Sequence, residues 1–424
     1  MRRIGRRGFL GAGAAGLAVL AAPAVLGQAR PRAVVVGGGS GGATAARYLA
    51  RDGAGAIDVT LIEPARRYDT CYFGNLYIGG FRDLESLGHS YARLATEYGI
   101  NVVHDWADAI DRDAREVRLA SGGSVPYDRL ILSPGIAFRQ DAIEGWDIAA
   151  LARMPHAYTG GTQVALLRAQ IEAMPPGGLF VMVAPPNPYR CPPGPYERIS
   201  MIAHLLSGTN PTAKIVLIDP KETFSKQALF EEAWGTLYPG MIDRLPTDLV
   251  GPVERVDAGT MEIVTATETF RADAANIIGP QEAGRIAHRA GLVNEAGWVP
   301  VSAFDMRSRE DEAIFVLGDS AQQGDMPKSA YAANSQAKVA AMVVRSELTG
   351  SRAFPARYAN TCWSLLGPEN GVKIGATYEP TEEKIATVEG SNFVSQTGED
   401  AELRAATYRE SLDWYDAIVA DMFG

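Results

Sequence analysis

The stretch that decides the fold is Ala33-Val34-Val35-Val36-Gly37-Gly38-Gly39-Ser40-Gly41-Gly42. Its apolar residues predict a short strand, which runs into a GxGxxG turn. An alanine-rich segment then predicts a helix from about Gly41 to Arg51, and a second strand over 58–62 ends in Glu63. A strand, a glycine turn, a helix and a terminal acid at this spacing predict a dinucleotide-binding unit of an α/β fold.

Each part of this unit has a physical role. Gly37 permits the tight turn, Gly39 lets a pyrophosphate approach the backbone, and Gly42 lets the helix pack closely on the strand. The helix N-terminus at Ser40 offers backbone N–H groups and a positive dipole end to the phosphates. Glu63 is placed to hold the hydroxyls of an adenosine ribose. A glycine-rich turn with a purely structural role is the alternative.

Two later segments favour FAD as the dinucleotide. Residues 127–135 read as a strand that runs into a turn at Gly135, and residues 313–319 read as an apolar strand that ends in Gly318-Asp319. Both are typical of flavoproteins with two nucleotide-binding domains, where such an aspartate contacts the ribityl chain of FAD. A plain turn at the end of a strand is the alternative for Asp319.

The segment Met326-Pro327-Lys328-Ser329 precedes an alanine-rich stretch that predicts a helix over 330–347. Proline and serine both favour the start of a helix. A helix N-terminus directed at the flavin pyrimidine would stabilise the reduced, anionic flavin. Lys328 and Ser329 are therefore candidate flavin contacts, and an ordinary capped surface helix is the alternative.

A second strand-helix-strand unit is predicted over 179–184, 198–206 and 214–219. Its loop contains no GxGxxG and instead carries five prolines before Gly194 and one after it. Because proline lacks a backbone N–H, this loop cannot wrap a pyrophosphate, and an NAD site is not expected. The same loop contains Cys191, which lies beside Arg190 and near a helix N-terminus. Both the arginine and the helix N-terminus favour a thiolate. A buried, inert cysteine is the alternative.

The N-terminal segment predicts an export signal, with a membrane anchor as the alternative. Arg6 and Arg7 precede a Gly/Ala/Leu run, and a small-x-small cleavage site follows at about Ala29. Removal of residues 1–29 takes four arginines away and leaves 36 basic against 50 acidic residues, a net charge of −14. We therefore expect periplasmic export by the twin-arginine route and no binding to nucleic acid.

Three cysteines remain in the exported chain, where a disulfide can persist. An odd number leaves one over, either as a free thiol or as a covalent attachment point. No CxxCH motif is present, so no haem is expected on this chain. The five histidines show no ligand spacing, and no metal site is expected.

The chain resembles the flavoprotein subunit of flavocytochrome c sulfide dehydrogenase over essentially its whole length. The segments that carry the resemblance are CYFGNLYIGG from Cys71, PPNPYRCPPGPYERISM around Cys191, MPKSAYAANSQAKVAA from Met326 and NTCWSLL around Cys362. These segments are far more specific for this family than the glycine turn is. The resemblance implies an FAD-dependent sulfide dehydrogenase that passes electrons to a c-type cytochrome subunit or a soluble cytochrome c, without membrane insertion.

The resemblance also implies a role for each cysteine. Cys71 matches the residue that binds FAD covalently, Cys191 and Cys362 match a redox-active disulfide beside the flavin, and Glu197 matches an acid that handles protons. From the residues alone, a Cys71–Cys191 disulfide with Cys362 free stays open. Glu197 as a simple first-turn helix residue also stays open.

Other functions fit parts of the same pattern. A sulfide:quinone oxidoreductase shares the fold and the cysteine pair, although the acidic C-terminal segment is a poor membrane binder. A non-catalytic persulfide carrier or electron-transfer scaffold and an NADPH-dependent disulfide reductase are the remaining alternatives.

The predicted fold class is α/β, with two Rossmann-like domains of the glutathione-reductase type and a C-terminal α+β interface domain. The FAD-binding domain is expected to be split over 30–145 and 270–350. The second Rossmann-like domain is expected over 146–269, and the interface domain over 351–424.

Overall fold

The first nucleotide-binding unit is a parallel sheet with β1 (Arg32–Val36) at its centre. The computed structural model describes residues 29–424, so the predicted signal peptide, residues 1–29, lies outside the described residues apart from Ala29. The strand order is β20-β9-β1-β2-β5. The other strands are β2 (Asp58–Ile62), β5 (Asn101–Val103), β9 (Arg129–Leu132) and β20 (Ile314–Val316). The late segment predicted over 313–319 therefore returns to the first sheet and forms its edge strand.

Helix α1 (Ser40–Gly53) follows β1 through the glycine turn, and it packs against β1, β2 and α9 (Ala330–Thr349). Gly37 has a φ of +94°, a conformation that glycine adopts at little cost. A Cβ atom at Gly42 would stand 1.7 Å from the Gly37 carbonyl oxygen. The predicted roles of Gly37 in the turn and of Gly42 in helix–strand packing are therefore confirmed.

The second sheet has the order β13-β12-β11-β17, with all neighbouring strands parallel. Its strands are β11 (Leu179–Val183), β12 (Lys214–Asp219), β13 (Ile242–Pro246) and β17 (Ala274–Ile277). Its helices are α4 (Thr162–Glu172), α5 (Gly194–Thr209) and α6 (Gln227–Leu237). Helix α5 begins four residues before the predicted start at Arg198, because Pro195 lies in the first turn, where a missing N–H breaks no helical hydrogen bond.

The end of the second sheet falls later than the sequence predicted. Strand β17 pairs with β11, so residues 274–277 lie in the second sheet, beyond the expected boundary at 269. After β17 the chain re-enters the first sheet only at β20. The division into domains otherwise stays a prediction, because residues Pro31–Gly424 form one compact unit.

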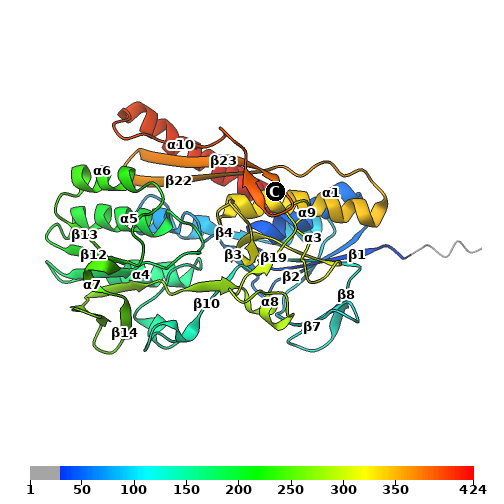
Figure 1. Cartoon of the computed structure of the whole chain (residues 1–424), viewed down its shortest axis with the longest axis horizontal. Helices are drawn as coiled ribbons and strands as arrows, with labels where there is room; N and C mark the ends of the chain where they lie inside the picture. The colour runs from blue at the N-terminus through cyan, green and yellow to red at the C-terminus, as the bar shows by residue number, and fades with distance from the viewer. Residues whose placement is uncertain (1–28) are drawn as a thin grey trace, which may run out of the picture. The chain divides into compact units, whose positions relative to one another are not determined.

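The C-terminal segment lies across both nucleotide-type units (Figure 1). Strand β22 (Tyr358–Gly367) pairs antiparallel with β23 (Asn370–Pro380), and β22 contacts both α5 and α9. Helix α10 (Ala401–Phe423) packs on β23 and α1. The same sheet includes β24 (Ile385–Thr387) and β25 (Phe393–Val394). Among residues 29–424 no helix is both long enough and apolar enough to cross a bilayer.

Smaller elements complete the chain around these three parts. They include β3 (Arg67–Asp69), β4 (Gly88–Ser90), α2 (Gly74–Ile78), β6 (Ala107–Asp111), β7 (Glu116–Leu119), β8 (Ser124–Pro126), β14 (Val253–Asp257), β15 (Glu262–Thr265), β16 (Thr269–Arg271) and α8 (Arg285–Arg289).

The contact between Gly42 and Gly37 yields a stability test. We expect Gly42→Ala to lower the free energy of unfolding by about 1–3 kcal/mol or more, because the added methyl must displace backbone. The matched control is Gly235→Ala, also inside a helix, where a Cβ meets nothing within 4 Å. That control should raise stability by about 0.5–1 kcal/mol. Urea unfolding measures both, and equal midpoints would contradict the packing role.

Candidate active site

All three cysteines line one cavity of about 100 Å³, together with Glu197 and Ser329. The cavity collects residues from distant parts of the chain. Cys71 lies between β3 and α2, Cys191 precedes α5, and Cys362 lies in the middle of β22. The structure holds the three cysteines as thiols, so the Cys191–Cys362 disulfide and the link through Cys71 stay predictions. The enclosed space is large enough for a small sulfur anion.

Backbone hydrogen bonds hold Cys191 in an unusual conformation. Its φ is +59°, which a non-glycine residue rarely adopts. The Cys191 N–H donates to the Lys328 carbonyl (2.8 Å), and the Gly194 N–H donates to the Cys191 carbonyl (2.8 Å). The first bond ties the proline-rich loop to the start of α9, so the position of Cys191 depends on both nucleotide-type units.

The expectation of a Cys191 thiolate is wrong. Burial raises the pKa of Cys191 well above its usual range, and the negative charges of Cys362, Glu197 and Cys71 add to the shift. The neighbouring Arg190 guanidinium is engaged elsewhere, since it donates to the Tyr158 carbonyl and lies 3.7 Å from Asp319 Oδ2. The buried site therefore favours an uncharged sulfur at this position.

Glu197 is fixed from two sides. Its Oε2 accepts from Asn75 Nδ2 (2.8 Å), and its Oε1 accepts from the Leu365 N–H in β22 (2.8 Å). Burial raises the pKa of Glu197, although these two hydrogen bonds oppose the shift. Such a carboxyl keeps its proton at a pH where an exposed glutamate is ionised, which suits a group that handles protons.

Sequence reasoning missed two buried cations, Arg198, which lines this cavity, and Lys226, which contacts the strand of Cys362. Arg198 is buried, and its guanidinium donates to Asn75 Oδ1, Asn276 Oδ1 and the carbonyls of 156 and 157. Lys226 is buried too, and its Nζ donates to the Cys362 carbonyl (3.1 Å) and to Ser364 Oγ (2.8 Å). Arg198 lies in the segment around Cys191 that carries the resemblance, whereas no local motif marks Lys226, because its partners are far away in the sequence.

A second cavity, of about 670 Å³, opens at the end of the glycine turn. Gly37, Glu63 and Pro134 line it. Glu63 Oε2 accepts from the Gly38 N–H (2.8 Å), and Glu63 Oε1 accepts from the Ala65 N–H (2.9 Å), so the carboxylate is fixed at the cavity edge. This position agrees with the predicted ribose contact.

Three observations fit FAD to these residues. No side chain caps the N-terminus of α1. A Cβ at Gly39 would lie 3.7 Å from its nearest protein atom, so protein packing does not demand a glycine there, whereas a close phosphate would. Asp319 Oδ1 is buried and has no hydrogen-bond partner among the described residues, which leaves an acceptor for a ligand hydroxyl.

The remaining predicted flavin contacts surround Asp319. Gly318 and Gly135 have φ values of +71° and +70°, and Ser320 Oγ donates to the Gly135 carbonyl (2.5 Å). Lys328 Nζ donates to the carbonyls of 319 and 321 (both 2.7 Å), so its ammonium supports the loop that carries Asp319. Ser329 Oγ caps α9 at the Ala332 N–H and donates to Asn360 Oδ1 (2.5 Å).

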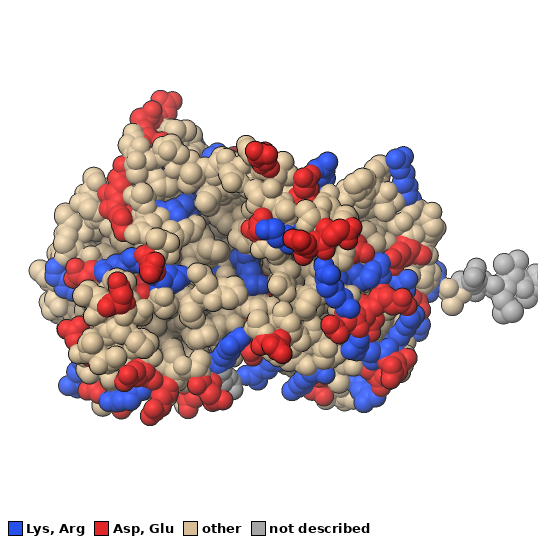
Figure 2. Space-filling view, viewed as in Figure 1, with Lys and Arg blue, Asp and Glu red and all other residues tan. Residues whose placement is uncertain are grey.

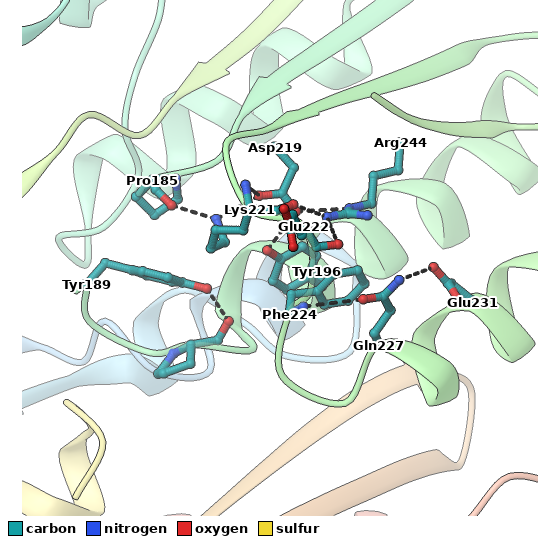
Figure 3. A network of polar contacts seen from close by, with 11 residues as sticks. Pro185, Tyr189, Tyr196, Asp219, Lys221, Glu222, Phe224, Gln227, Glu231 and Arg244 are labelled. Carbon is teal, nitrogen blue, oxygen red and sulfur yellow. Dashed lines mark hydrogen bonds and ion pairs between the residues drawn. The ribbon is translucent and has the colours of Figure 1, made fainter. Parts of the chain in front are cut away.

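A charge network occupies the end of β12, where a related unit would bind the ribose of NAD. Asp219 is fully buried and lies 2.7 Å from Lys221 Nζ, 3.0 Å from Arg244 Nε and 2.9 Å from the Tyr196 hydroxyl. Figure 3 shows these groups converging on Asp219, and Lys221 also donates to the Pro185 carbonyl (2.6 Å). Because the Asp219 carboxylate is paired with two cations, it is not available to accept hydrogen bonds from the hydroxyls of a ribose. This supports the expected loss of the NAD site.

Comparisons with known proteins agree with this geometry. The family model for pyridine nucleotide-disulphide oxidoreductases matches residues 31–160. The central model for the sulfide dehydrogenase (flavocytochrome c) flavoprotein chain matches 164–279. The flavin-binding model for flavocytochrome c sulphide dehydrogenase matches 354–423, the segment that supplies Cys362.

The chain is 54% identical over 44 residues to the sulfide dehydrogenase (flavocytochrome c) flavoprotein chain of Chlorobaculum thiosulfatiphilum, covering 10% of this chain and 90% of that one. It is 22% identical over 300 residues to the mitochondrial sulfide:quinone oxidoreductase of Mus musculus, covering 68% of this chain and 64% of that one. It spans about a third of the length of two ferredoxin reductases that it also matches.

The crystal structure of the sulfide:quinone oxidoreductase from Aquifex aeolicus superposes with a TM-score of 0.70 at 18% identity, covering 91% of each chain. That likeness confirms the predicted fold class, with two Rossmann-like domains of one type. The family models and the Chlorobaculum relative, taken with the cavity that gathers the three cysteines, show that the chain belongs to the family of flavoprotein chains of flavocytochrome c sulfide dehydrogenase.

Proposed function

We propose that the chain is an FAD-dependent sulfide dehydrogenase in which Cys191 and Cys362 form the redox-active disulfide and Cys71 binds the flavin covalently. The observation that carries this proposal is one cavity, which gathers all three cysteines and Glu197 from three separate segments. An odd number of cysteines fits one attachment point plus one pair.

FAD would be held by the glycine turn, Glu63 and Asp319, and when bound it supplies a two-electron acceptor that can release electrons singly. The residues of the chain carry out the sulfur chemistry. Hydrosulfide attacks one sulfur of the Cys191–Cys362 disulfide, the S–S bond breaks, and a persulfide forms on one cysteine and a thiolate on the other. Glu197, whose pKa burial raises, holds a proton next to these sulfurs.

We propose a c-type cytochrome as the electron acceptor, either a separate subunit or a soluble cytochrome c. The apolar side chains Ile418, Met422 and Phe423 of α10 are buried within the chain, so the helix does not present them to a quinone-containing membrane. Acidic and basic side chains are intermixed on the face drawn in Figure 2. Periplasmic export remains a proposal that rests on the twin-arginine pattern at Arg6 and Arg7.

The covalent link can be tested by mass spectrometry. The mature protein is denatured in acid, and its peptides are analysed. We expect a flavin mass on the peptide that contains Cys71, and we expect Cys71→Ser to release its flavin under the same treatment. Flavin released from the unsubstituted protein, with an unmodified Cys71 peptide, would contradict the proposed covalent link.

The cysteine pair can be tested by sulfide-dependent reduction of cytochrome c. We expect Cys191→Ser and Cys362→Ser each to lower the rate by about 10³-fold or more, and the double variant to be no slower than either one, because paired sulfurs act as a unit. Flavin absorbance and melting temperature serve as folding controls. Wild-type rates in a well-folded single variant would contradict the disulfide mechanism.

Glu197→Gln tests the proton-handling role. The amide keeps the shape but carries no transferable proton, so we expect the rate to fall by about 10²–10⁴-fold. In the unsubstituted protein the Glu197-dependent rate should fall as pH rises through the raised pKa of its carboxyl, and the variant should lack this change. The matched control is Glu231→Gln on the exposed side of α6, which should leave the pH–rate profile unchanged. An identical profile for Glu197→Gln would show that the carboxyl is only structural.

A further inference from the structure

Lys226 is a buried cation next to the cysteine pair. It precedes α6 with a φ of +63°, in the left-handed region that non-glycine residues rarely adopt. Its Nζ donates to the Cys362 carbonyl (3.1 Å) and to Ser364 Oγ (2.8 Å), both on β22. The strained backbone therefore directs the ammonium to the strand that carries Cys362.

The hydrogen bonds of this ammonium, among the described residues, go to two neutral oxygens. Removing an ammonium from water costs several kcal/mol when no opposite charge compensates it. Lys221, five residues earlier, is buried as well, but its Nζ lies 2.7 Å from the Asp219 carboxylate. The same loop thus holds one paired lysine and one whose electrostatic neighbours are the ionisable groups of the sulfur site.

Those neighbours are Cys362, Glu197 and Cys191, and each of them favours the protonated lysine when it is ionised. Burial has the larger effect and lowers the pKa of Lys226 to about 8. Of the other two cations near the cavity, Arg190 lies 3.7 Å from Asp319, and the acceptors of Arg198 include Asn276 and the carbonyl of 157, which are not on β22. Lys226 is therefore charged at neutral pH and directed to the strand of Cys362.

We infer that Lys226 is a positioning residue whose ammonium stabilises the one anion, thiolate or persulfide, that forms when the Cys191–Cys362 disulfide opens. The inference rests on the proposed function and adds to it the source of the compensating charge. Attack by HS⁻ breaks one S–S bond and forms another, and it brings one negative charge into the cavity without electrons from elsewhere. A protonated Glu197 does not supply a positive charge, whereas Lys226 does.

The position of Lys226 also suggests a role for the second unit, which lacks a nucleotide-binding loop. The segment after β12 is the place where a dinucleotide-binding unit recognises a ribose. In this chain the acid at that place is Asp219, and it is paired with buried cations of the same unit. The residues that follow it place Lys226 beside the strand of Cys362. The loop after β12 thus contains both the paired Asp219 and the buried cation Lys226.

The test measures the thiolate content of the reduced pair in the holoprotein, without sulfide turnover. The protein is reduced anaerobically, and the rate at which Cys362 is alkylated is followed on its peptide, because this rate is proportional to the thiolate fraction. Lys226→Gln keeps a hydrogen-bond donor and removes the charge. At pH 7 we expect it to slow the alkylation of Cys362 about tenfold, because the thiolate has lost its compensating cation. Lys226→Arg should restore most of this rate.

The pH dependence separates charge from structure. The difference in alkylation rate between Lys226→Gln and the unsubstituted protein should be present below pH 8 and vanish above it, because Lys226 itself becomes neutral there. Ser364→Ala, which removes a hydrogen-bond partner and keeps the ammonium, is the matched control and should show a much smaller change in rate at pH 7. If Lys226→Gln does not fold, the unsubstituted protein alone must show a Cys362 alkylation rate that rises less steeply with pH around 8 than below it, because Lys226 loses its charge there.

An alkylation rate of Cys362 that is identical for Lys226→Gln and the unsubstituted protein at every pH would overturn the inference while leaving the proposed function in place. A pair that never forms a disulfide under oxidising buffer would instead overturn the proposed function. A rate difference of equal size at pH 7 and pH 10 would show that Lys226 acts through packing, and it would also overturn the inference.

Discussion

The packing of β22 between α5 and α9 is the constraint on which the site depends. This strand carries Cys362, and its Leu365 N–H holds Glu197 at the start of α5. On the other side, the start of α9 holds Cys191 through the Lys328 carbonyl. Since each of the three reactive residues is fixed by an element of another part of the chain, the cavity exists only when all three parts are packed together.

The second unit shows that a nucleotide-binding fold persists without its nucleotide loop. Its four parallel strands are buried by apolar residues such as Phe180, Ile215 and Ala274, and this core makes no use of a glycine turn. The loop at the strand ends is therefore not needed for this core. Its prolines lack the N–H groups that a pyrophosphate needs, and the acid of β12 is part of an internal ion network.

Much of the fold could be predicted from the sequence because its signals are local. The apolar strands, the glycine turn and the late return of residues 313–319 all follow from short patterns, and the structure confirms them. The specific segments around the three cysteines likewise predicted residues that share one cavity.

The rest of the site depends on contacts between distant residues. Arg190 is next to Cys191 in the sequence and suggested a thiolate, but its side chain reaches Asp319, and burial decides the pKa of the sulfur. Lys226 has no motif around it, because its partners on β22 lie more than a hundred residues later. The extension of the second sheet to β17 depends on strand pairing, which composition alone does not reveal.

The crossing of β22 over both units has a mechanical consequence. Many two-domain enzymes open and close about a hinge, and that motion often limits the rate of turnover. Here a hinge movement would have to slide α5 or α9 along the strand and pull Glu197 away from Leu365. The packing of β22 on both helices therefore opposes a hinge movement between the two units.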